Sequence, residues 1–395
     1  MGFLAKAAAL FVGLRVTASY HETLKVAPSQ EDKLKAARAE IRAAIRKAGA
    51  RIRTDNRFWE AAFAAKAISS RPEVEPKFFT QGSVAYNLLV DPCQSPPQQL
   101  DLDDGMYVLV DYLQNGQPAL VAKALFKMVE EALQPLCDRH GWKLVEKDQC
   151  VRVQLNAGSH IDIPIYSAPR AVAESRELQE AAFAAGHVAK RAGHIYAKLP
   201  SDQIMLAHRD GTWQPSDPLK LHDWVEACVQ RYGEDFRRAC RYFKGWRDFE
   251  WAKCCLTSIT IMAAVQKALE ELRGTHKGFA DDRLVYEIAH LLPDIFDGEL
   301  LNPAFPGKRV VLNDWTACER EGVVEAARRL ADDMDAALKR NADQTQVVNA
   351  LRRAFGPRIP YRPDAVEILP PATAAVATAK AATVAAPKVI NSNSG

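Results

Sequence analysis

The sequence predicts an α+β fold in which a mixed sheet flanked by helices forms one lobe and a mainly helical second lobe follows it. The β-branched and apolar runs that are typical of strands cluster between residues 77 and 169. From about residue 171 to residue 353, apolar residues recur at spacings of three and four, as in amphipathic helices. The chain of 395 residues exceeds the ~250–300 residues that one hydrophobic core usually supports.

The segment before the predicted sheet is expected to be helical. Residues 2–14 are apolar, and we interpret them as a first helix rather than a signal peptide or a membrane anchor. Residues 31–70 place Leu34, Ile41 and Ile45 at helical spacing with charged residues between them, which predicts a long amphipathic helix. Its basic run at residues 42–53 has the composition of a solvated helix face.

The predicted sheet begins at residue 77. KFFTQGS indicates a short strand that ends in a Gly-Ser turn, and QLDLDDGMYVLVDYL, at residues 99–113, indicates a half-buried strand that becomes fully buried. A helix is expected at residues 119–140. Two or three further strands are expected between residues 143 and 169, where Asn-Ala-Gly interrupts the β-branched runs.

The rest of the chain is predicted to be helical up to a terminal tail. Helices are expected at residues 172–191, 218–232, 234–243, 248–272, 283–292 and 323–353. Residues 370–395 are low in complexity and are expected to form a flexible tail. The predicted units are therefore an N-terminal helix with the sheet lobe at 1–170, a helical lobe at 171–369 and the tail at 370–395.

The composition limits the class of partner. Lys and Arg number 52 against 49 acidic residues, so a formal charge of +3 provides no overall field for binding a long polyanion. The eight cysteines form no CxxC pair and no Cys/His cluster. We expect reduced thiols in a cytoplasmic protein, without a structural zinc site and without a membrane association.

Three acidic positions stand out because of their places in the predicted strands. Side chains two residues apart share a face of a strand, so Asp101 and Asp103 project together while Asp104 points away. Asp162 lies on a later strand that can pair alongside. Carboxylates side by side repel each other unless a cation lies between them, so the pattern predicts a three-carboxylate metal site. The alternative is an ordinary polar strand face, and we interpret His160 as a strand residue rather than a ligand.

Oxygen ligands of this kind suit Mg²⁺, which Mn²⁺ can replace. Two such ions can activate an attacking hydroxyl and stabilise a leaving pyrophosphate, and Asp162 can also take the proton of that hydroxyl. Upstream, Gly82 lets the backbone approach a phosphate, and Ser83 adds a hydroxyl to an anion-binding turn. The sequence contains no GxxxxGK[ST] motif, which disfavours a P-loop enzyme.

These blocks together resemble the nucleotidyltransferase core of the polymerase-beta superfamily. QGSVAYNLL, DLDDGMYV, HIDIPIYSAP and RDGTWQPSDPLKLHDW are similar to blocks of the bacterial cyclic GMP-AMP synthases, in the cGAS/DncV-like (CD-NTase) family of anti-phage signalling systems. The blocks span about residues 78–224, and FKGWRDFEW continues the similarity. The resemblance implies a bilobal enzyme that uses two magnesium ions to condense ATP, GTP or both into a cyclic di- or trinucleotide and releases pyrophosphate.

The resemblance also implies roles for individual residues. In the sheet lobe, Gln81, Gly82 and Ser83 are expected to cradle the donor triphosphate, with Tyr86 close to the nucleotide. Arg152 is expected to contact an adenine or a phosphate, or else to be a solvent-facing strand residue. Asp101, Asp103 and Asp162 are expected to hold magnesium and to be the catalytic residues. The resemblance implies further roles in the second lobe and the tail.

In the helical lobe, Ser216 and Asp217 are expected near a base, and Lys244 and Ser258 at triphosphate oxygens. In related systems a ubiquitin-activating-like partner attaches the synthase through its C-terminus, which implies that Gly395 is a conjugation point or, alternatively, an end without a role. The zinc ligands of the animal enzymes are absent, so we expect no requirement for double-stranded DNA. Two other hypotheses stay open: an enzyme that makes a linear product or modifies an RNA or protein acceptor, and an inactive scaffold.

Overall fold

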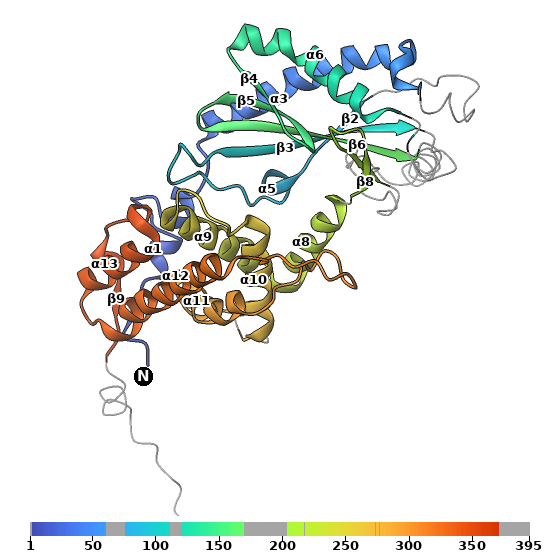
Figure 1. Cartoon of the computed structure of the whole chain (residues 1–395). Coiled ribbons are helices and arrows are strands. Elements are labelled where there is room, and N and C mark those ends of the chain that lie inside the picture. Colours follow the sequence, from blue (N-terminus) through green and yellow to red (C-terminus); the bar gives the residue numbers. More distant parts are fainter. Residues whose placement is uncertain are drawn as a thin grey trace, which may run out of the picture.

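The computed structural model of the chain describes residues 2–60, 76–110, 118, 120–169, 204–216, 218–272, 274–275 and 277–370. These residues form a sheet lobe and a helical lobe, drawn one above the other in Figure 1, and each lobe has a large hydrophobic core of its own. The predicted α+β class and the two-lobe arrangement are confirmed.

A seven-stranded mixed sheet forms the centre of the first lobe. Its main path runs in the order β2 (Lys77–Thr80), β3 (Leu100–Val110), β6 (Ser159–Pro169), β5 (Cys150–Asn156) and β4 (Lys143–Glu146). β7 (Met205–Ala207) pairs with β6 and with β8 (Trp213–Pro215). β3 and β6 are parallel, whereas the other strand pairs of this sheet are antiparallel. Positions in register on β3 and β6 therefore place their side chains next to each other.

Two long helices cover one face of this sheet (Figure 1). α3 (Pro28–Gly49) and α6 (Ala122–His140) bury apolar side chains such as Leu34 and Leu125 in one core with Leu102 of β3 and Ile161 of β6. α6 ends at Gly141, which adopts a left-handed conformation with φ of 70° that glycine tolerates without steric cost. Because alternate residues of a strand point to opposite faces, the neighbours of Leu102 and Ile161 project from the other face of the sheet.

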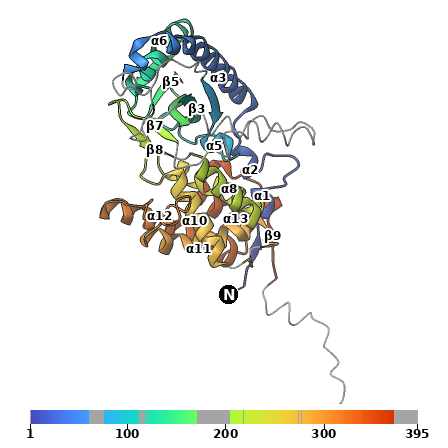
Figure 2. The same ribbon diagram turned by 90° about the vertical axis from the view of Figure 1, so that its right-hand side faces the viewer.

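The helical lobe consists mainly of α8 (Pro218–Tyr232), α9 (Glu234–Glu250), α10 (Ser258–Glu271), α11 (Asp281–Asp297), α12 (Ala317–Asp335) and α13 (Gln344–Phe355), which Figure 2 shows from a second side. Shorter helical turns are η1 (Ala50–Arg53), η2 (Asn56–Phe58), the π-helical η5 (Ala336–Arg340), η6 (Gly356–Arg358) and η7 (Pro363–Ala365). α5 (Gly82–Ala85) is a single turn in the sheet lobe.

Three predicted helices are shorter than the sequence suggested. The helix predicted at 248–272 is interrupted after Glu250. A new helix, α10, begins at Ser258, because the Thr257 side chain caps it by accepting a hydrogen bond from the Thr260 amide. The helix predicted at 323–353 is interrupted in the same way by Asp343, which caps α13. α3 ends at Gly49, well before residue 70. The helix predicted at 172–191 lies outside the described residues.

The N-terminal segment belongs to the helical lobe by its packing. Instead of one helix over residues 2–14 it forms β1 (Ala5–Lys6), α1 (Ala8–Phe11) and, further on, α2 (Tyr20–Thr23). β1 pairs with β9 (Glu367–Ile368), and Leu10, Phe11 and Tyr20 are fully buried in the core of the helical lobe. The domain boundaries at residues 170 and 369 stay predictions, but the lobes exchange segments across them, since residues 205–215 also pair with the sheet.

Two further findings concern the whole described chain. Among the helices of the described residues, none combines the length and the apolar character that a crossing of the membrane needs. All eight cysteines lie in described segments and carry free thiols.

Candidate active site

Asp101, Asp103 and Asp162 come together on the sheet face that α3 and α6 leave uncovered. Asp103 of β3 lies in register with Asp162 of the parallel strand β6, and Asp101 lies in register with His160. Asp101 and Asp103 are two residues apart, as are His160 and Asp162, so all four side chains project from one face. The juxtaposition of the three carboxylates, predicted from strand alternation, is what the structure shows.

Asp104 points to the opposite face, as predicted. Its fully buried carboxylate accepts hydrogen bonds from Arg42 of α3, one of them from Nε at 2.7 Å. Thr80 also contacts this pair, since its hydroxyl accepts a hydrogen bond from the Nη2 of Arg42 at 3.3 Å. Asp104 therefore ties the strand to the helix that covers it.

The charged form of Asp103 is disfavoured by its surroundings. Burial, with added repulsion from Asp101 and Asp162, raises the pKa of Asp103 to about 7. Arg152 of β5 relieves part of this charge, because its Nε and Nη2 donate to the two oxygens of Asp162, each at 2.7 Å. The predicted contact of Arg152 with a nucleotide stays a proposal, since in this structure the guanidinium binds Asp162.

His160 also lies within this group: it is a residue of strand β6, as predicted, and whether it is also a ligand is not decided by that position. It is buried, its Nδ1 lies 2.7 Å from the Gln99 Oε1, and its Nε2 lies 3.0 Å from the Asp101 Oδ1. The sequence carried one usable signal, the placement of His160 two residues before Asp162 and therefore on the same strand face.

The arrangement fits a divalent cation. Asp101, His160 and Asp162 each offer a ligand atom, and these atoms all lie within 4.8 Å of one another. The buried Asp101 Oδ1 and His160 Nε2 have no hydrogen-bond partner among the described residues. Clustered carboxylates with unsatisfied buried atoms are the environment that a bound cation stabilises.

The Gly-Ser turn lies directly beside the carboxylates. Gly82 adopts φ of 63°, and a Cβ at this position would lie 2.1 Å from the Asp103 Oδ2. Glycine is therefore required both by the backbone conformation and by the close approach of Asp103. The Gln81 side chain is held on the same sheet face, because its Nε2 donates to the Tyr107 hydroxyl at 2.6 Å and its Oε1 accepts from Tyr166 at 3.3 Å. Its contact with the triphosphate stays a prediction.

Ser83 and Lys244, predicted to contact the triphosphate from different lobes, contact each other. The Lys244 Nζ donates to the Ser83 Oγ at 3.0 Å and to the Leu88 carbonyl at 2.6 Å. Burial, with a smaller contribution from Arg247, lowers the pKa of Lys244 to about 8. Both hydrogen-bond partners of this buried ammonium are neutral groups, and its contact with a triphosphate stays a prediction.

A basic face of α9 binds Tyr86 and Asn87, which follow the Gly-Ser turn. Arg237 donates to the Tyr86 carbonyl at 3.3 Å, and Arg241 donates to the Asn87 Oδ1 at 2.8 Å. Together with Lys244, these residues have spacings of four and three, so they lie on one face of the helix. Sequence analysis identified Lys244 alone, because nothing in the sequence links α9 to a turn about 150 residues earlier.

The remaining predicted residues are more scattered. Tyr86 is buried in the core of the helical lobe, Ser216 follows β8, and Ser258 begins α10, where its Oγ accepts from Arg247 at 3.2 Å. Their contacts with nucleotides stay predictions. Asp217 and Gly395 lie outside the described residues.

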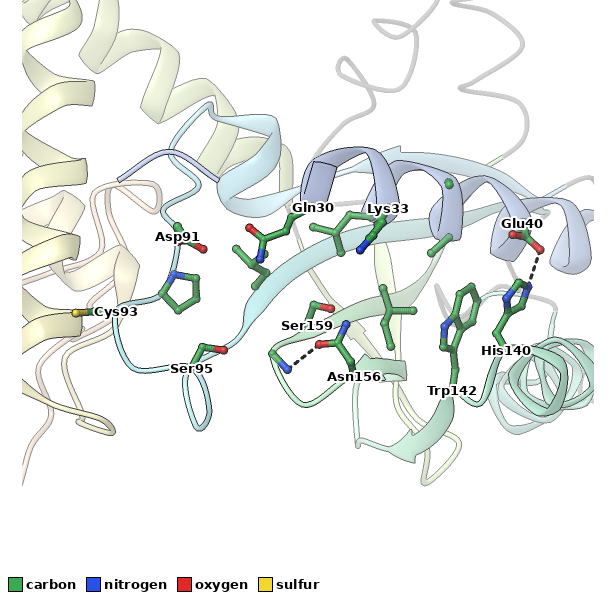
Figure 3. Close-up of a pocket in the computed structure, with 17 residues that line it drawn as sticks. Gln30, Lys33, Glu40, Asp91, Cys93, Ser95, His140, Trp142, Asn156 and Ser159 are labelled. Carbon is green, nitrogen blue, oxygen red and sulfur yellow. Dashed lines mark hydrogen bonds and ion pairs between the residues drawn. The ribbon is translucent and has the colours of Figure 1, made fainter. Parts of the chain in front are cut away.

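A cavity of about 690 Å³ lies on the other face of the sheet (Figure 3). Its lining combines α3 with the ends of the strands, including Leu100 and Ser159, which precede Asp101 and His160 and point the opposite way. None of the predicted site residues lines it. We therefore expect the nucleotides on the carboxylate face.

Comparison with protein families gives two matches along the chain. The model of the nucleotidyltransferase domain of DncV-like cyclic GMP-AMP synthases matches residues 76–166, which carry the three carboxylates and the Gly-Ser turn. The model of the C-terminal domain of cyclic GMP-AMP synthase matches residues 233–366, which include Lys244 and Ser258.

Curated relatives and solved structures agree with these matches. The cyclic GMP-AMP synthase of Vibrio cholerae is 30% identical over 311 residues, which are 72% of this chain and 68% of the relative. The cyclic GMP-AMP synthase of Escherichia coli is 28% identical over 302 residues, which are also 72% of this chain and 68% of the relative. The structure of Vibrio cholerae DncV with a linear intermediate has a TM-score of 0.75 and 22% identity, and covers 94% of this chain and 100% of that chain.

A second structure, Escherichia coli DncV bound to 3'-deoxy GTP, has a TM-score of 0.71 at 23% identity and covers 92% of this chain and 99% of that chain. These structures share the fold of the present chain, and the family matches cover both of its lobes. The chain therefore belongs to the DncV-like family of cyclic GMP-AMP synthases, a family of metal-dependent nucleotidyltransferases.

Proposed function

We propose that the protein condenses ATP and GTP into a cyclic dinucleotide of the cyclic GMP-AMP type. Each of the two condensations forms one phosphodiester bond and releases one pyrophosphate. The observation that carries the proposal is the register of β3 and β6, which sets Asp103 beside Asp162 with Asp101 on the same face. Three carboxylates that converge next to a Gly-Ser turn are an arrangement that suits nucleotidyl transfer.

Asp101, Asp103 and Asp162 are proposed to hold two Mg²⁺ ions, whose chemistry when bound is to acidify the attacking hydroxyl and to neutralise charge on the leaving pyrophosphate. Asp162 is also proposed to accept the proton of the attacking ribose hydroxyl. Its carboxylate is oriented by Arg152, which leaves a second lone pair free on each oxygen.

Lys244 and Ser83 are proposed to hold the donor triphosphate where the lobes meet. The Lys244 ammonium already lies 3.0 Å from the Ser83 hydroxyl, so a phosphate oxygen that enters there meets a cation and a hydroxyl together. Charge-assisted hydrogen bonds of this kind are stronger than neutral ones. Gly82 keeps the space above Asp103 open, so that the phosphate chain and the carboxylates can approach each other.

The relatives support the choice of substrates. One structure of the Vibrio cholerae enzyme is a complex with ATP and GTP, and another holds the linear intermediate 5' pppA(3',5')pG. A linear intermediate is expected for a cyclase that makes two bonds in sequence at one site. The role in anti-phage signalling and the attachment of a ubiquitin-activating-like partner at Gly395 remain proposals that rest on the family resemblance.

Labelled ATP and GTP, incubated with the purified protein and Mg²⁺ and then treated with phosphatase, test the proposal. A cyclic product has no terminal phosphate, so its label survives the phosphatase and its mass identifies the bases. A linear oligonucleotide loses its 5'-terminal phosphates to the phosphatase and is recognised by the mass of the dephosphorylated product, and transfer of label to RNA or protein points to acceptor modification. If no triphosphate is consumed, the protein is a scaffold and the proposal is wrong.

A further inference from the structure

The arrangement around His160 carries an inference that rests on the proposed function and extends its metal site. We propose that the Nε2 of His160 is a nitrogen ligand of a divalent cation that Asp101 and Asp162 also bind. The site then contains one imidazole among its carboxylates, rather than oxygen ligands alone. The proposal stands on the contact that fixes the hydrogen of the His160 Nδ1. It also stands on two buried atoms, the His160 Nε2 and the Asp101 Oδ1, which lie close together without a hydrogen-bond partner among the described residues.

The proton of His160 is placed by Gln99. The Gln99 Nε2 donates to the Ala157 carbonyl at 2.9 Å, which fixes the orientation of this amide and leaves its Oε1 as an acceptor. The His160 Nδ1, 2.7 Å from that oxygen, must therefore carry a hydrogen. In a neutral imidazole, the Nε2 then bears a lone pair. A histidine that ligates a metal is oriented in this way by an acceptor on its other nitrogen.

The Nε2 of His160 lies close to a carboxylate. The side chain of His160 is 7% exposed, its Nε2 lies 3.0 Å from the Asp101 Oδ1, and neither atom has a hydrogen-bond partner among the described residues. Two buried acceptor atoms at this distance repel each other unless they share a cation. The Asp162 Oδ1, 4.0 Å from the same nitrogen, offers a third ligand atom.

Arg152 does not fill the site. Its guanidinium uses one lone pair on each oxygen of Asp162, and a carboxylate oxygen has two. Mg²⁺ prefers oxygen ligands, whereas an imidazole nitrogen favours transition metals. His160 is therefore expected to raise the affinity of this site for Mn²⁺ and Co²⁺ more than its affinity for Mg²⁺.

The direct test is pulsed electron paramagnetic resonance of Mn²⁺ bound to the full-length protein in the absence of nucleotide. Wild-type protein is expected to show the modulation of a directly coordinated ¹⁴N nucleus, and His160→Gln is expected to lack it. The Kd for Mn²⁺ should rise at least ten-fold in His160→Gln, since the loss of even an outer-shell partner costs about 10–100-fold. His140→Gln, which changes a histidine on the other face of the sheet, is the control and should match wild type.

The wild-type spectrum decides the question even if His160→Gln does not fold. Absence of ¹⁴N modulation in wild type, or failure of wild type to bind Mn²⁺ at millimolar concentrations, overturns the proposal. In the first case, His160 is a neighbour of Asp101 and not a metal ligand. Failure of the proposed function has a different signature, namely ¹⁴N modulation in a protein that makes no cyclic product from ATP and GTP.

Discussion

Arg152 and Asp162 lie directly opposite each other on the antiparallel strands β5 and β6, and two hydrogen bonds of 2.7 Å join the guanidinium to both carboxylate oxygens. Such a fork fixes the plane of the carboxylate as well as its position. Since Asp162 also lies in register with Asp103, the pair determines how the third carboxylate meets the other two. Arg152 is thus a positioning residue of the site, whatever contact it makes with a nucleotide.

Arg152→Lys should lower kcat about 10- to 100-fold and leave KM for ATP and GTP unchanged, because lysine keeps the charge but cannot form the fork. Steady-state kinetics with each triphosphate varied in turn measures both constants. A rise in KM with kcat unchanged would mean that Arg152 serves nucleotide binding instead, as the sequence first suggested.

Asp103 and Asp104 are adjacent in sequence but should respond oppositely to mutation. Between the ordinary value of 3.8 and its raised pKa of about 7, Asp103 holds a proton in the folded, metal-free protein that the unfolded chain has lost. Stability without metal should therefore fall as the pH rises through this window. Asp103→Asn should remove this fall in stability with rising pH. At pH 8 it should raise the free energy of unfolding by on the order of 1–3 kcal/mol.

Asp104→Asn is the matched control for that experiment. It leaves the Arg42 guanidinium without its buried partner, so it should destabilise the protein by about 3 kcal/mol. Thermal unfolding in the presence of a chelator at pH 5 and pH 8 separates the two variants. Destabilisation by Asp103→Asn at pH 8 would show that the carboxylates do not repel one another as described.

Gly82→Ala should abolish product formation. A Cβ at Gly82 would overlap the Asp103 Oδ2, and φ of 63° adds about 1–2 kcal/mol of strain for any other residue. Gly141→Ala provides the comparison, since Gly141 has a similar φ of 70° but nothing within 4 Å of the added atom. Gly141→Ala should be less stable than wild type but should keep the wild-type turnover rate. Equal activity of the two variants would remove the steric argument.

Lys244→Met should raise KM for the triphosphates ten-fold or more, because the change keeps a long unbranched side chain but removes the charge that binds phosphate. The pKa of Lys244 is lowered to about 8, so the affinity of wild type for triphosphate should weaken as the pH rises through this value and the ammonium loses its proton. Binding titrations at pH 7 and pH 9 should show this dependence in wild type and not in Lys244→Met. A variant with wild-type affinity at pH 7 would mean that Lys244 is purely structural.

The carboxylate site could be predicted because its geometry follows from local rules. Alternation along one strand places Asp101 with Asp103 and turns Asp104 away, and a parallel neighbour brings Asp162 alongside. The Gly-Ser turn is likewise a local signal. These inferences need only the direction of side chains within single strands and one correct strand pairing.

The parts that sequence analysis missed depend on contacts between distant segments. Gln99 orients His160 across 61 positions, and Arg241 reaches Asn87 across 154 positions. The packing of Tyr20 against Tyr242, with ring centroids 5.6 Å apart, draws the N-terminal segment into the helical lobe. No periodicity encodes such pairs, because they arise when whole elements pack together.

Product formation by Asp101→Asn tests the central claim most directly. The substitution removes one ligand charge with almost no change in volume, so the fold should persist, as measured by circular dichroism and by thermal unfolding. With ATP, GTP and Mg²⁺, wild type should yield a phosphatase-resistant cyclic dinucleotide by mass spectrometry, and the variant should yield none. A folded Asp101→Asn protein that makes the cyclic product at the wild-type rate would contradict the assignment of these carboxylates to catalysis.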